Sequence, residues 1–144
     1  MSFRDFSGRV HALAEPLTEL QFWTNPYGYG NSFGHLVLHL TGNLNYYIGT
    51  QIAGTGYVRD REREFTDTNP PAKAVALKNL DDAIAMVIRT FEAQTNESWS
   101  FPYEAKGAEV ITNRFGILLR CTSHFHHHLG QMIYLNKEFT KAST

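Results

Sequence analysis

Apolar residues recur at helical spacing in four segments of the chain, separated by turn-forming or charged stretches. The first set stands three and four positions apart and consists of Phe3, Phe6, Val10 and Leu13. This spacing places the four side chains on one face of an α-helix. Pro16 then interrupts the pattern, and we expect it to open a short second turn carrying Leu17 and Leu20.

The second long helix is predicted to follow the segment 25–31, which is dense in turn-forming residues. Asn31 or Ser32 suits its N-cap, and we expect the helix to end near Gly54. Its apolar positions are Leu36, Leu40, Leu44, Tyr47 and Ile48. The polar and charged stretch 55–69 then predicts a long connection, and connections of that length are uncommon unless they are functional or tied down.

Two further helices are predicted in the second half of the chain. Pro70 and Pro71 can start the third helix, whose apolar stripe consists of Leu77, Leu80, Ile84, Val87, Ile88 and Phe91. After an irregular stretch over 95–107, the last helix is expected to begin near Thr112 or Asn113 and to run to about Glu138. No segment requires a strand.

These elements predict an all-α fold in which residues 1–144 form a single domain. A chain of 144 residues with 42% hydrophobic residues is long enough and apolar enough to bury a core. Four helices joined by two longer connections predict an antiparallel four-helix bundle with nonstandard connectivity.

Composition and charge argue against several classes of protein. The formal net charge of -1 gives no electrostatic case for binding nucleic acid or an anionic membrane. No apolar run approaches the ~20 residues that cross a bilayer, and the first residues lack the apolar region of a signal peptide. Cys121 is the single cysteine, which excludes an intrachain disulfide and a zinc site built from thiolates. We expect a cytoplasmic protein.

Histidines supply the candidate chemistry, because four of the seven fall within residues 124–128. His124 and His128 are four positions apart, so both imidazoles can reach one metal ion from the same helix face. Two ligands do not make a site, so a third must come from elsewhere in the chain. The best candidate is His39, which forms the only other histidine pair together with His35. Three histidines without a fourth protein ligand would be typical of a catalytic metal site.

The neighbours of these histidines leave alternatives open. His35 or His127 could join the site, whereas His126 points to the opposite side of its helix. Asn43, Tyr46, Gln131 and Cys121 share the histidine faces, and for them packing, capping or a buried inert thiol is favoured over a role in the site. The histidine cluster itself could instead bind metal incidentally, or consist of hydrogen-bonded core residues. Arg59, Arg61 and Arg63 could attract an anionic cosubstrate, although a solvated surface loop is the simpler interpretation. Aromatic residues at the loop–helix borders could line a pocket mouth or cap the core; they are Phe22, Trp23, Tyr27, Tyr29, Trp99, Phe101 and Tyr103.

Three stretches of the sequence resemble the DinB-like (damage-inducible) superfamily. Residues 31–44 resemble its second-helix motif, and residues 124–131 resemble its last-helix motif of histidine, three residues, histidine, one residue, glycine and glutamine. The charged segment 59–65 resembles a charged segment found in one small-protein branch of this superfamily. The likeness extends from about Pro16 to Lys137.

The resemblance implies a four-helix bundle of DinB-like type that binds one divalent metal ion, zinc or nickel, through His39, His124 and His128. It also implies a homodimer. Relatives include metal-dependent thiol transferases that use bacillithiol or related low-molecular-weight thiols, and a mycothiol-dependent maleylpyruvate isomerase. The family name does not imply DNA binding.

Two functions are therefore carried forward from the sequence. The first is a metal-dependent thiol transferase or hydrolase, in which the metal would lower the pKa of a bound thiol or water. The second is a non-enzymatic, metal-stabilised binding or stress-response protein, in which the metal clamps two helices together. No pair of carboxylates near the histidines suggests an acid–base mechanism.

Overall fold

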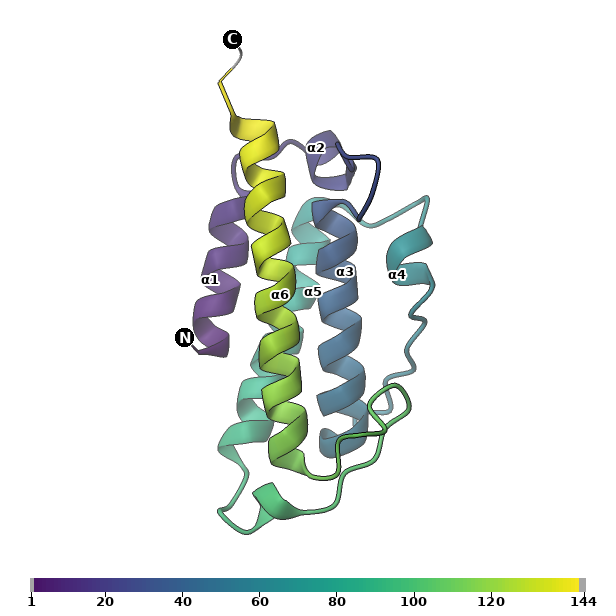
Figure 1. Cartoon of the computed structure of the whole chain (residues 1–144), viewed down its shortest axis with the longest axis vertical. Coiled ribbons are helices and arrows are strands. Elements are labelled where there is room, and N and C mark those ends of the chain that lie inside the picture. The colour runs from purple at the N-terminus through teal and green to yellow at the C-terminus, as the bar shows by residue number, and fades with distance from the viewer. Residues whose placement is uncertain (1, 143–144) are drawn as a thin grey trace.

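Helices make up all of the regular structure in the computed structural model, which describes residues 2–142 (Figure 1). The α-helices are α1 (Phe3–Ala14), α2 (Glu19–Trp23), α3 (Phe33–Leu44), α4 (Arg63–Thr66), α5 (Lys73–Glu92) and α6 (Arg114–Thr140). A π-helix, η1 (Asn45–Ala53), continues α3, and a 3₁₀ turn, η2 (Ser98–Ser100), lies between α5 and α6. Within the described range there is no strand, only an isolated bridge between Pro102 and Asn113. The all-α prediction is confirmed.

The four long helices lie side by side around one hydrophobic core (Figure 1). Helices α1 and α3 each pack against both α5 and α6, while the short α4 lies outside α3. The rings of Phe6 and Phe125 stack with their centroids 4.4 Å apart and join α1 to α6. Phe125 and Leu129 are buried in the core. The residue before each of them is rotated by about 100° around the axis of α6, because an α-helix has 3.6 residues per turn. These residues, His124 and His128, face α3.

The start of α3 and the end of the helical run follow the sequence prediction, but the type of helix changes within the run. The Ser32 side chain caps the helix by accepting a hydrogen bond from the backbone N–H of His35, at 3.1 Å. The helical run ends at Gly54, which adopts a left-handed φ of 66°. From Asn45 onward, however, the run is a π-helix, which the apolar spacing does not reveal.

The shorter elements lie close to their predicted places. The helical turn expected after Pro16 forms, but it begins only after Thr18, which caps α2. Leu20 lies in this helix and is exposed, whereas Leu17 precedes it and is buried. Asn113 caps α6, as one of the two predicted positions. No helix among residues 2–142 is long and apolar enough to cross a membrane.

Candidate metal centre

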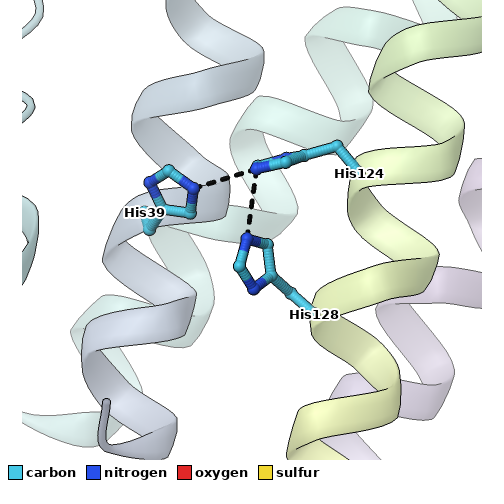
Figure 2. Close-up of side chains that lie close together, drawn as sticks. All are labelled: His39, His124 and His128. Atoms are coloured by element: carbon cyan, nitrogen blue, oxygen red, sulfur yellow. Dashed lines mark hydrogen bonds between the residues drawn. The ribbon is translucent and has the colours of Figure 1, made fainter. Parts of the chain in front are cut away.

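Three histidine side chains from two helices converge at one point. His39 extends from α3, and His124 and His128 extend from successive turns of α6 (Figure 2). The Nε2 atom of His124 lies 2.9 Å from Nε2 of His39 and 3.1 Å from Nε2 of His128. One ligand atom from each residue lies within 4.8 Å of the others, and no other described His, Cys, Asp or Glu belongs to this group. The tertiary fold therefore brings together the three residues that the sequence singled out.

Hydrogen bonds on the far side of two rings determine which nitrogen faces the centre. Nδ1 of His39 lies 3.0 Å from a carboxylate oxygen of Glu64, and Nδ1 of His128 lies 2.7 Å from Oε1 of Gln131. Both partners are acceptors, so Nδ1 of each neutral imidazole carries the hydrogen and Nε2 carries the lone pair.

The central atom, Nε2 of His124, thus faces two lone pairs. A hydrogen on that atom could be donated to only one of the two neighbours, and the other contact would be repulsive. The Nδ1 atom of His124 is buried and has no hydrogen-bond partner among the described residues. A cation at the centre would satisfy all three lone pairs at once, so the donor set fits a metal ion.

The spacing of the nitrogens also suits a divalent ion. Two nitrogens that each lie about 2.0–2.1 Å from one ion can be 2.9 Å or 3.1 Å apart, as the Nε2 atoms are here. Three histidines would leave coordination positions for a further ligand.

Burial keeps two of the three imidazoles neutral. Burial, together with the neighbouring His128 and His39, lowers the pKa of His124 to about 3. Burial also lowers the pKa of His128 to about 4, although its hydrogen bond to Gln131 opposes the shift. Neutral imidazole is the form that binds metals, so these two ligands need release no proton at neutral pH.

A buried ion pair lies directly behind His39. Glu64, in α4, is 6% exposed, and its carboxylate accepts hydrogen bonds from Nε and Nη2 of Arg59, each at 2.8 Å. Arg59 and Glu64 thus depart from the interpretation of the connection 55–69 as a solvated loop, whereas Arg61 and Arg63 are exposed. Sequence reasoning missed Glu64, and the only signal for it was a charged segment inside an unusually long connection.

Gly42 makes room for this carboxylate. Gly42 lies three residues after His39 on α3, and a Cβ atom there would overlap the Oε2 atom of Glu64. The close approach of α4 to α3 therefore depends on the absence of a side chain at this position.

One family model covers most of the chain. The model of the DinB superfamily matches residues 3–132, which include all three histidines. The chain belongs to the DinB superfamily. No curated protein matches the sequence.

The remaining candidates in this DinB superfamily member lie outside the histidine group. His35 contacts the Ser32 hydroxyl and the Asp67 carbonyl, and His127 lies beside His128, with ring centroids 4.9 Å apart. His126 is exposed and packs edge-on against Phe6.

The polar companions of the histidines also serve other roles. The Asn43 side chain is buried, and the Tyr46 hydroxyl accepts a hydrogen bond from the backbone N–H of Lys106. Burial raises the pKa of the Cys121 thiol to about 12, as expected for an inert thiol. Among these companions only Gln131 forms a hydrogen bond with a histidine of the group.

A cleft of about 940 Å³ opens onto the three histidines. Its lining residues are Tyr27, Tyr29, Gly30, Asn31, Leu36, His39, Arg61, Phe65, His124, His127, His128, Gly130, Gln131, Tyr134 and Leu135. None of them is acidic. The stacked rings of Tyr27 and Tyr29, 5.5 Å apart, belong to one wall, as the pocket-mouth alternative predicts. Trp99 instead packs against Phe91 and Phe115, near the start of α6.

Proposed function

We propose that this DinB superfamily protein is a metal-dependent thiol transferase or hydrolase. The metal, zinc or nickel, would be held by His39, His124 and His128. The observation that carries the proposal is the convergence of three Nε2 atoms beside an open cleft that all three histidines line. A purely structural site would favour four protein ligands and no cleft.

The residues around the cleft support chemistry on an anionic or weakly acidic ligand. A divalent ion in the site would lower the pKa of a thiol or water that reaches it. Arg61 lines the cleft, with its guanidinium 5.5 Å from the Phe65 ring, and none of the described lining residues is acidic. Arg61 is thus placed to attract an anionic low-molecular-weight thiol.

A non-enzymatic role is the second candidate, because the donors come from two helices. An ion shared by α3 and α6 would cross-link residues 85 positions apart in the sequence, and its binding energy would stabilise the fold. Such a protein would lose stability on chelation and show no turnover.

Elemental analysis of untagged protein tests the metal site. We expect about one metal ion per chain, in keeping with a single three-histidine site. The metal should be lost in His39→Ala, His124→Ala and His128→Ala, and kept in His126→Ala, which changes an exposed neighbour. Metal that survives all three changes would refute the site. Loaded protein should then be assayed for thiol transfer and hydrolysis; bound metal without turnover would favour the second candidate.

The oligomeric state and the location complete the proposal. The four long helices support a bundle of DinB-like type, and Phe115 and Leu119, one turn apart on α6, are about half exposed. This apolar pair supports a homodimer, which light scattering on purified protein would test. The lone cysteine is in keeping with a cytoplasmic protein.

A further inference from the structure

Among the described residues, Glu64 is the one carboxylate that bonds to the histidine group, and it reaches the group from outside the long helices. Its Oε1 atom lies 3.0 Å from Nδ1 of His39, and both of its oxygens are bound by Arg59. The side chains of Glu64 and Arg59 are only 7% and 9% exposed. The connection 55–69 thus delivers a buried charge pair to the back of one candidate ligand.

Stability alone does not account for a buried charge pair at this place. Removing two charges from water costs several kcal/mol for each ion, and apolar residues of similar size often serve the fold equally well. A carboxylate behind a ligating histidine has a separate effect, because it fixes the tautomer and orientation of the ring and raises its basicity.

The hydrogen-bond lengths define the tautomer. Nη2 of Arg59 lies 3.4 Å from Nδ1 of His39, but 2.8 Å from the carboxylate. The guanidinium therefore bonds chiefly to Glu64, and Glu64 accepts the Nδ1 hydrogen of His39. This leaves the Nε2 lone pair of His39 directed at His124.

The three histidines differ in this respect. His128 has a neutral partner, Gln131, and the Nδ1 atom of His124 has none among the described residues. Of the three, only His39, which comes from a different helix, bonds to a charged group within the described part of the chain.

We propose that Glu64 is a positioning residue of the metal centre: it holds His39 with Nδ1 protonated and Nε2 free for the ion, and Arg59 supplies its counter-charge. The proposal rests on the proposed metal site. The proposal makes the connection 55–69 part of the metal centre, because Glu64 holds His39 in its metal-binding orientation only when this segment folds onto α3.

Two variants distinguish a role of Glu64 in positioning His39 from a role in balancing the charge of Arg59. Glu64→Gln keeps the shape of the side chain but removes its charge, leaving Arg59 uncompensated. The double variant Arg59→Met/Glu64→Met replaces the whole pair by apolar chains of similar length. Glu62→Gln, an exposed position on the same connection, is the matched control.

Three measurements are made on each protein: zinc affinity by competition with a chromogenic chelator, urea unfolding, and the His39 tautomer from ¹⁵N NMR of the metal-free protein. We expect Glu64→Gln to weaken zinc binding about 10–100-fold. The double variant should unfold at wild-type urea concentrations or above, yet bind zinc as weakly and lose the single Nδ1–H tautomer. Glu62→Gln should match the wild type.

Wild-type zinc affinity in the double variant would overturn the proposal, because Glu64 would then serve only to balance Arg59. An unchanged His39 tautomer in the double variant would overturn it as well. If the wild-type protein binds no metal, the proposed function fails, but the tautomer in metal-free protein still decides whether Glu64 orients His39.

Discussion

Replacing Gly42 by alanine tests whether the packing of α4 against α3 sustains the metal centre. A Cβ at this position would overlap the Glu64 carboxylate that contacts His39. Gly8 offers a matched control, since it also lies inside a helix and a Cβ there would meet no atom within 4 Å. The two variants carry the same chemical change, with and without the steric conflict.

The two variants are expected to change the free energy of unfolding in opposite directions. In a helix interior, alanine is favoured over glycine by about 0.8–1 kcal/mol, so Gly8→Ala should raise stability by roughly 0.5–1 kcal/mol. Gly42→Ala gains the same helix propensity, but overpacking lowers its stability by about 1–3 kcal/mol. It also disturbs the bonds of Glu64 to Arg59 and His39, and bonds to charged groups contribute about 1.5–3 kcal/mol each. We expect a net loss of about 1–3 kcal/mol.

Urea unfolding followed by circular dichroism measures both variants, and chelator competition measures their zinc affinity. Gly42→Ala should also bind zinc more weakly than Gly8→Ala, because the displaced carboxylate no longer holds His39. If Gly42→Ala is as stable as Gly8→Ala and keeps wild-type zinc affinity, then the carboxylate has found an equivalent position and the reasoning is refuted.

Three further results are expected. Lowering the pH from about 7 to about 5 should destabilise the metal-free protein: folded His124 and His128 have pKa values of about 3 and 4, so they stay neutral while the unfolded chain binds protons near pH 6.5. Urea titrations at several pH values should show that stability depends less on pH in His124→Gln/His128→Gln than in the wild type, and an equal dependence would contradict the assignment of the effect to these two histidines. Free zinc at one hundred times its Kd should stabilise the wild type by about 2.7 kcal/mol, so chelation should lower the melting temperature in a thermal scan; an unchanged melting temperature would argue against binding to the folded state. Cys121 should react with a disulfide reagent only after unfolding, because it is buried and burial raises its pKa to about 12; rapid labelling of native protein would disprove its burial.

Local features of this protein were predictable from sequence because they depend on neighbours along the chain. Helical periodicity predicted the long helices, and Ser32 and Asn113 were among the residues expected to cap α3 and α6. The placement of His124 and His128 on one face of α6 follows from helix geometry alone. Each of these features is decided within about one helical turn.

Packing between distant segments decided the rest. His39 approaches His124 across 85 positions because α3 and α6 pack together, and periodicity carries no information about which faces meet. Glu64 belongs to a polar connection, where a charge is ordinarily solvated; Gly42 and Arg59 give it a buried place. The change from α- to π-helix at Asn45 also lies outside the apolar pattern. The sequence determined the helices and which histidines share a face, whereas the tertiary structure decided which groups meet, since burial and charge pairing arise only when distant segments come together.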